Sequence, residues 1–117
     1  MGNLTKNGIL ATVETHTVNQ TGVKTSGVIY QNDGYERLVI VNVAITCAPA
    51  TSDQYDAYVE AATPPTVVQG TVGSSATGIL LATLIFTVPP NQYYEVIETP
   101  AGAAIGAINS WFEKDFN

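Results

Sequence analysis

The sequence has little charge, and most of that charge is negative. Charged residues are only 12% of its 117 residues, with four Lys or Arg against ten Asp or Glu and a net charge of −6. Proteins bind nucleic acid by neutralising phosphates with Lys and Arg, so four scattered cations predict no nucleic-acid partner. The same shortage argues against binding to anionic membranes. A helical bundle is also disfavoured, because its solvent faces need many charged residues.

Cysteine and long apolar runs are equally scarce. A single cysteine, Cys47, excludes an internal disulfide and offers no zinc ligand set. It ends an apolar run, which predicts a small buried core residue, and a free thiol suits assembly in a reducing cytoplasm. Residues 1–10 lack the apolar core of a signal peptide. The most apolar stretch, residues 78–88, is far shorter than the roughly 20 residues of a membrane helix, so no membrane insertion is expected.

The residues that catalysis or metal binding require are also few. The only histidine, His16, accompanies no nucleophile-elbow motif, and we interpret it as a strand residue, with a three-fold cluster of His16 copies as the alternative. Asp53 and Asp56 lack the spacing of a calcium loop. Asp56 and Glu60 share one face of a strand and form a weak candidate for a glycosidase pair. We therefore expect no enzymatic activity, no cofactor and no metal site.

Hydrophobic residues reach 45%, and they recur with a period of two, which is typical of strands. Residues 38–47 place one wholly apolar set on one face: Val39, Val41, Val43, Ile45 and Cys47. Residues 80–88 repeat the pattern with Leu80, Ala82, Leu84, Phe86 and Val88. Each of these faces is predicted to lie in the core.

Gly, Pro and Asn-Asp-Gly signals divide the chain into about eight short strands. The expected strands cover residues 9–18, 28–30, 38–47, 55–61, 66–72, 80–88, 93–99 and 107–112. This pattern predicts an all-β fold, an antiparallel sandwich or barrel, and of the two we expect the sandwich. Residues 1–8 are expected to form an N-terminal arm and residues 9–117 a single domain. Pro89-Pro90 should end one strand, and residues 93–99 should return as its antiparallel neighbour.

Several large apolar side chains are predicted to lie outside that core. Leu38, Ile40, Leu81 and Ile85 alternate with the core positions, so they need cover from a partner subunit. Trp111 is flanked by polar residues, which favours a contact surface for Trp111 and the core for its neighbour Phe112. The predicted subunit-contact residues are therefore Trp111, Tyr93, Tyr94, Leu38, Ile40, Leu81 and Ile85.

Two segments resemble a known family. Near the end of the chain, an apolar strand, a Pro-Pro turn and an aromatic strand form the run Phe86-Thr87-Val88-Pro89-Pro90-Asn91-Gln92-Tyr93-Tyr94-Glu95-Val96, and a later strand has the run Ile108-Asn109-Ser110-Trp111-Phe112-Glu113. Upstream, a long alternating strand follows the run Val28-Ile29-Tyr30-Gln31-Asn32. This pattern resembles small β-domains of tailed-bacteriophage virion proteins, most closely the C-terminal knobs of tail fibres. The resemblance covers roughly residues 23–113. It implies a homotrimeric, jelly-roll-like sandwich without enzymatic activity.

The chain has no fibre shaft before this domain, which favours a capsid decoration (cement) protein over a fibre knob. The expected function is a non-enzymatic structural protein on the virion surface, assembled in the host cytoplasm and bound to other virion proteins. A tail-fibre or tail-tip knob that attaches to the host is the first alternative. A lectin-like carbohydrate-binding module, with a host-surface glycan as partner and Tyr or Trp as stacking platforms, is the second.

Overall fold

The computed structural model describes residues 15–116, and these form eight strands and no helix. The strands are β1 (Thr15–Asn19), β2 (Tyr30–Gln31), β3 (Arg37–Cys47), β4 (Asp53–Glu60), β5 (Val68–Ser74), β6 (Gly78–Val88), β7 (Tyr93–Glu98) and β8 (Ile105–Phe116). The predicted all-β fold is confirmed. The proposed arm, residues 1–8, and the first part of the predicted 9–18 strand lie outside the described residues, as does the side chain of His16.

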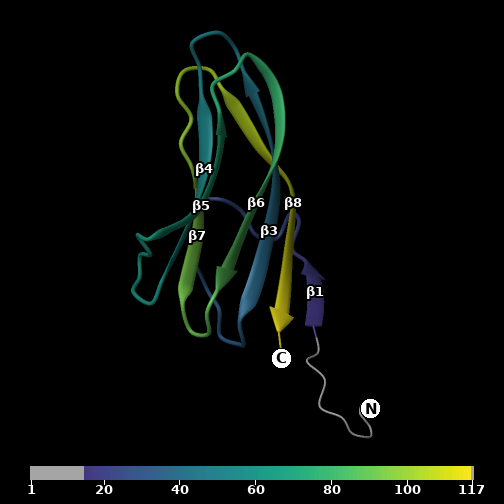
Figure 1. The fold of residues 1–117 in the computed structure, drawn as a ribbon, viewed down its shortest axis with the longest axis vertical. Coiled ribbons are helices and arrows are strands. Elements are labelled where there is room, and N and C mark those ends of the chain that lie inside the picture. Colours follow the sequence, from purple (N-terminus) through teal and green to yellow (C-terminus); the bar gives the residue numbers. More distant parts are fainter. Residues whose placement is uncertain (1–14, 117) are drawn as a thin grey trace, which may run out of the picture.

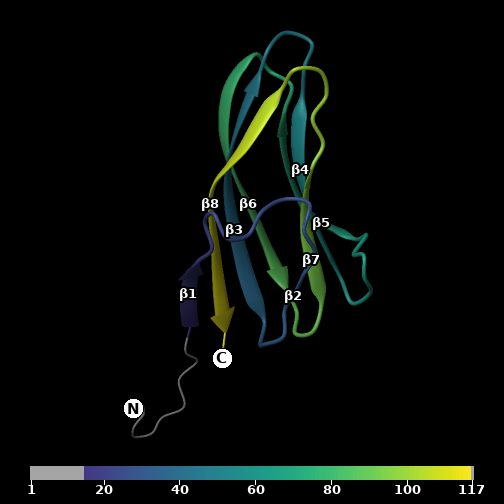
Figure 2. The ribbon, with the colours of Figure 1, turned by 180° about the vertical axis from the view of Figure 1, so that it is seen from behind.

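The strands form two four-stranded antiparallel sheets. One sheet has the order β1-β8-β3-β6 and the other has the order β2-β7-β4-β5. Figure 1 shows the second sheet on one side and the first on the other, with β1 at the outer edge of its sheet. Figure 2 shows the segment after β1 crossing from the first sheet to reach β2 in the second.

The inner faces of the two sheets meet in the core. The alternation predicted for β3 and β4 is confirmed, and in β6 it holds from Ala82 to Val88, whereas Leu80 is 37% exposed. Cys47 is buried as expected. The largest fully buried side chains are Trp111, Tyr55 and Tyr94, and valines, Ile45 and Leu84 fill the space between them. The outer face of the β1-β8-β3-β6 sheet carries many aliphatic side chains, whereas the outer face of the other sheet carries tyrosines and carboxylates.

Pro89-Pro90 ends β6 at Val88 as predicted, but the predicted pairing of residues 93–99 with that strand is wrong. β7 lies in the opposite sheet, between β2 and β4. The buried side chain of Asn32 fixes this crossing, because its amide donates to the Val88 carbonyl at 3.0 Å. Asn91 takes a left-handed backbone with φ 67°, and its N–H donates to the Asn32 carbonyl. The turn therefore sends the chain across the core instead of back along its own sheet.

The assignment of Trp111 to the surface and Phe112 to the core is also wrong. Trp111 is fully buried, whereas Phe112 is half-buried on the outer side of its sheet. The cause is a β-bulge: pairing with β3 passes from Asn42↔Ser110 to Val43↔Ile108, which leaves Asn109 without a partner. One extra residue reverses the alternation, so Ile108 and Trp111 both point inward.

Candidate functional site

The outer side of the β1-β8-β3-β6 sheet is apolar and largely exposed. We name its large apolar side chains the apolar face: Leu38, Ile40, Ile79, Leu81, Ile85, Ile105 and Phe112. Ile79, Leu81 and Ile105 are 73%, 72% and 68% exposed. The strand register gathers them, since Ile40 pairs with both Ile85 and Phe112. None of the outward residues of β3 or β6 is charged.

A polar row crosses the middle of the apolar face, and its members satisfy one another. Thr83 Oγ1 donates to Asn42 Oδ1 at 2.7 Å, and Asn42 Nδ2 donates to Ser110 Oγ at 2.7 Å. The three residues come from β6, β3 and β8. Covering polar groups is costly when they lose water without gaining a bond. Because the three side chains already bond to one another, a partner could cover the apolar face with little free-energy cost from desolvating polar groups.

The predicted contact residues divide into three groups. Leu38, Ile40, Leu81 and Ile85 lie together on the apolar face. Tyr93 lies on the outer side of the other sheet. Tyr94 and Trp111 are fully buried within the chain, so neither can offer a contact surface.

Three residues of the apolar face were not predicted from the sequence pattern. Ile79 was missed because the expected strand began one residue later, although the same alternation extends to it. Ile105 was missed because β8 begins two residues before the expected strand. Phe112 was predicted to face the core because the sequence pattern does not show the bulge, which turns its side chain to the outer face.

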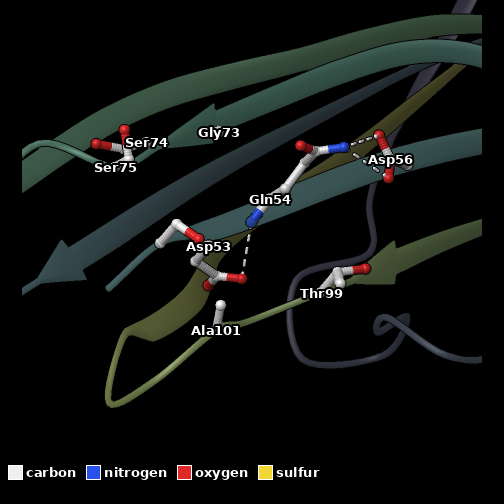
Figure 3. A pocket seen from close by; sticks show the side chains of 9 residues that line it. Asp53, Gln54, Asp56, Gly73, Ser74, Ser75, Thr99 and Ala101 are labelled. Atoms are coloured by element: carbon white, nitrogen blue, oxygen red, sulfur yellow. Dashed lines mark hydrogen bonds between the residues drawn. The ribbon is translucent and has the colours of Figure 1, made fainter. Parts of the chain in front are cut away.

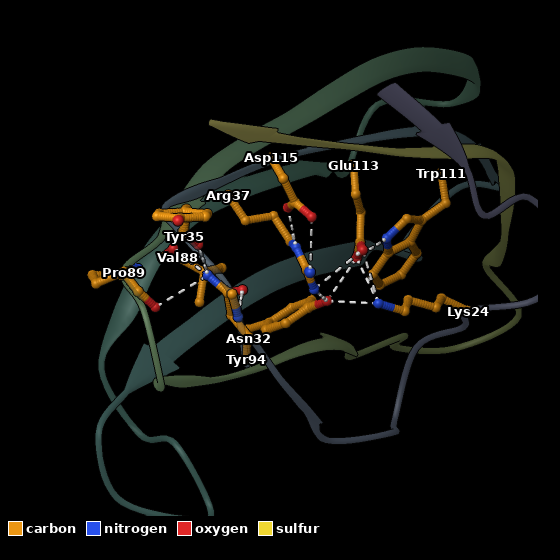
Figure 4. Close-up of polar contacts among 11 residues, drawn as sticks. Lys24, Asn32, Tyr35, Arg37, Val88, Pro89, Tyr94, Trp111, Glu113 and Asp115 are labelled. Atoms are coloured by element: carbon orange, nitrogen blue, oxygen red, sulfur yellow. Dashed lines mark hydrogen bonds and ion pairs between the residues drawn. The ribbon is translucent and has the colours of Figure 1, made fainter. Parts of the chain in front are cut away.

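Glu113 is the centre of a buried polar cluster (Figure 4). Only 4% of this residue is exposed. Its carboxylate accepts hydrogen bonds from the Tyr94 hydroxyl at 2.7 Å and from the Trp111 indole N–H at 3.1 Å. Lys24 Nζ lies 2.8 Å from one carboxylate oxygen and 3.0 Å from the other. The cluster thus ties the segment between β1 and β2 to both sheets.

Arg37 completes the charge balance of this cluster. Its Nη1 lies 3.4 Å from Glu113 Oε1, while its Nε and Nη2 donate to Asp115 at 2.6 and 3.2 Å. Burial lowers the pKa of Arg37, but hydrogen bonds to Asp115 and Tyr94 outweigh that effect and hold the pKa above its ordinary value. Burial, and then the bond to Glu113, raises the pKa of Tyr94, which therefore remains a donor. Two cations face two carboxylates, and we assign the cluster a structural role.

A polar pocket of about 650 Å³ lies at the end of the sandwich where β4 begins. Figure 3 shows Gln54 between two acids: its backbone N–H donates to Asp53 at 2.8 Å, and its side-chain amide donates to Asp56. The two carboxylates are on opposite faces of β4, so they do not converge on one ion. Within residues 15–116, no group of three or more His, Cys, Asp or Glu side chains is placed to hold a metal.

The carboxylate pair considered for glycoside hydrolysis has unsuitable geometry. Asp56 and Glu60 are on the same face of β4, but four residues of strand span about 13 Å. Glycosidase carboxylates lie roughly 5–9.5 Å apart. Each is also engaged elsewhere, since Asp56 accepts from Thr71 Oγ1 at 2.7 Å and Glu60 accepts from the Thr66 N–H at 2.7 Å. This pair is therefore a poor candidate for catalysis.

No protein-family model matches the sequence, and no curated protein matches it. In the part of the chain that the structure describes, no helix is long and apolar enough to cross a membrane. The feature that most clearly calls for a partner is the apolar face.

Proposed function

We propose that the protein is a non-enzymatic virion structural protein of a tailed bacteriophage, a homotrimeric capsid decoration protein that uses the apolar face for subunit contact. The observation that carries this proposal is the exposure of Ile79, Leu81 and Ile105 on a sheet surface where the outward residues of β3 and β6 carry no charge. Burying an aliphatic side chain is worth about 1.5–3 kcal/mol. Isolated exposed apolar residues are common on monomers, but a contiguous set marks an interaction site.

The order of the strands supports the same proposal. Sheets of order 1-8-3-6 and 2-7-4-5 fit a jelly-roll-like arrangement, in which successive strands cross repeatedly between two four-stranded layers. That architecture is frequent in viral capsid proteins and in lectins. The fold by itself does not define a function, which depends on the surfaces that the two sheets present.

We expect the protein to be a trimer at micromolar concentration and Leu81→Glu to be mainly monomeric. A carboxylate at the centre of an apolar contact would have to be desolvated without a partner charge. Multi-angle light scattering or native mass spectrometry measures the change. The matched control is Val23→Glu, which changes a 71%-exposed valine away from the apolar face and should leave the trimer intact. A wild-type protein that is monomeric at this concentration contradicts the proposed interface.

The virion assignment predicts a defined location of the protein on particles. Immunogold labelling or a cryo-EM reconstruction of the phage should place copies on the outside of the capsid in groups of three. Copies found at the tail tip would instead support a tail knob that attaches to the host. Particles without any copies contradict both structural roles.

The outer side of the second sheet supports carbohydrate binding as the second candidate. Tyr58 pairs with Glu95, and Glu60 pairs with Tyr93, so two half-buried tyrosines alternate with two carboxylates on neighbouring strands. Tyrosine rings stack on sugars, and adjacent carboxylates accept hydrogen bonds from sugar hydroxyls. This surface and the apolar face lie on opposite sides of the sandwich. A trimer could therefore form through one while the other faces outward.

A further inference from the structure

Two carboxyl groups meet inside one end of the sandwich. Asp53 and Tyr55 point inward from β4, and Glu98, which pairs with Tyr55, points inward from β7. Their oxygens surround the backbone of Gly106 in β8. A Cβ at position 106 would lie 2.5 Å from Glu98 Oε2 and would also collide with Asp53 Oδ2 and the Tyr55 hydroxyl. The absence of a side chain at Gly106 is what gives the three groups their space.

Among residues 15–116, no positive charge balances these acids. Asp53 is 98% buried: one of its oxygens accepts the Gln54 N–H at 2.8 Å, while Oδ2 has no donor among the described residues. Lys24 lines the same hollow as Glu98, but its ammonium group is bonded to Glu113 and to Tyr94. Tyr55, whose pKa is raised by burial and then by the neighbouring acids, stays neutral.

The other elements around the acids supply no cation either. Asp56 lies on the opposite face of β4 and is bonded to Gln54 and Thr71. β3 brings the Cys47 thiol to this end, where it contacts the Ser74 carbonyl of β5. The inward residues of β6 and the start of β8 are uncharged. Two ionised carboxylates would therefore repel each other with only the hydrogen bonds from Tyr55 and the Gly106 backbone to favour the charge on Glu98, and a proton on one of them supplies the missing donor to Asp53 Oδ2.

We infer that Asp53 and Glu98 share one proton, and that loss of this proton as pH rises loosens the end of the sandwich where β4, β7 and β8 meet. The shared proton links β4 to β7 beside Gly106. Without it, two negative charges face each other inside the protein, and the ends of these strands should separate or admit water. The fold thus contains a pH-sensitive contact that is independent of the apolar face.

The direction of the pH dependence follows from the protonation of the folded state. Burial, and then the hydrogen bond and the charge of Asp53, raises the pKa of Glu98 from its ordinary value of 4.5 to about 7. A group that binds its proton more tightly in the folded state stabilises the fold fully below its unfolded pKa, and this contribution is lost as pH rises through the folded pKa. Water screens part of the repulsion because Glu98 is only half-buried. We expect the unfolding equilibrium constant to rise on the order of tenfold to a hundredfold between pH 5 and pH 8.

The test is urea unfolding of the wild-type protein, Glu98→Gln and the control Glu95→Gln between pH 5 and pH 8. Glu98→Gln keeps a donor for Asp53 but carries no titrating proton, so its stability should change much less with pH. Glu95 lies on the outer face of β7, and its variant should keep the wild-type slope. His16 is present in all three proteins, and therefore the slope is assigned from the difference between variants. A wild-type stability that does not fall, or an unchanged slope in Glu98→Gln, overturns the inference.

Two further measurements cover the remaining outcomes. If Glu98→Gln fails to fold, carbon-13 NMR of the wild-type carboxyl groups should show one glutamate titrating near pH 7, and the absence of such a titration overturns the inference. Calcium chloride at 1 mM and pH 8, about the upper limit for dissociation constants of extracellular calcium sites, distinguishes a proton from a metal ion. If calcium restores the stability of the wild-type protein at pH 8 but has no effect on Glu98→Gln, then Asp53 and Glu98 bind a cation. That result would overturn the inference of a shared proton.

Discussion

Glu113→Gln is expected to lower the free energy of unfolding by about 3–5 kcal/mol, the cost of removing one partner from a buried ion pair. The substitution nearly preserves shape, so the packing of Trp111 should persist. It removes the negative charge that faces Lys24 at 2.8 Å, and the largely buried ammonium group then has only neutral acceptors, the new amide oxygen and the Tyr94 hydroxyl. Urea or thermal unfolding measures the loss.

The matched control for this prediction is Asp115→Asn. Asp115 accepts from Arg37, but its side chain is 31% exposed, compared with 5% for Glu113. Water can replace much of the interaction that Asp115 makes with Arg37, and exposed ion pairs contribute roughly 0–1 kcal/mol to the free energy of unfolding. Equal losses for Glu113→Gln and Asp115→Asn would contradict the assignment of Glu113 as the centre of the cluster.

Trp111→Ala is expected to destabilise the folded protomer by about 3–5 kcal/mol. The indole is fully buried, and its ring packs edge-on against Tyr30 with the ring centroids 6.0 Å apart. Its N–H donates to Glu113, so the variant also takes a donor from a buried carboxylate. The substitution leaves a cavity between the sheets that the surrounding strands cannot close. Chemical denaturation of the variant at fixed protein concentration measures the cost.

The neighbouring variant Phe112→Ala should behave in the opposite way. Phe112 is half-buried on the apolar face, opposite Ile40, so its removal should cost the protomer roughly 1 kcal/mol and weaken self-association more. Light scattering over a dilution series separates the two effects. The opposite result, in which Trp111→Ala dissociates the assembly and Phe112→Ala unfolds the protomer, would contradict the orientation that the bulge imposes.

The two ends of the sandwich are joined by different polar chemistry. Around Glu113, two cations balance two carboxylates, and each main polar group has a partner. Around Asp53 and Glu98, the part of the chain that the structure describes supplies no cation, and a proton has to supply the balance. We therefore expect mild alkaline conditions to loosen the second end before the first. The two variants Glu113→Gln and Glu98→Gln should accordingly differ in their dependence on pH.

The sequence alone determined the fold class and the faces of the regular strands. Alternation in residues 38–47 and 80–88 requires that one set of side chains be buried, because a strand sends successive side chains to opposite sides. The same periodicity placed Leu38 and Ile40 on the outer face of one strand, and Leu81 and Ile85 on the outer face of another. Pro89-Pro90 marked the end of β6 because neither residue can donate to a ladder.

Only the tertiary structure decided which strands are neighbours and where the alternation breaks. β7 belongs to the opposite sheet because the buried Asn32 amide holds the turn after Val88, and that contact joins residues 56 positions apart. The bulge at Asn109 depends on the pairing of β8 with β3, so no local pattern indicates that Trp111 turns inward. Glu113 looked like a surface residue because its partners, Lys24 and Arg37, are distant in sequence. A charged side chain can be buried only where folding brings it partners that compensate for the loss of water.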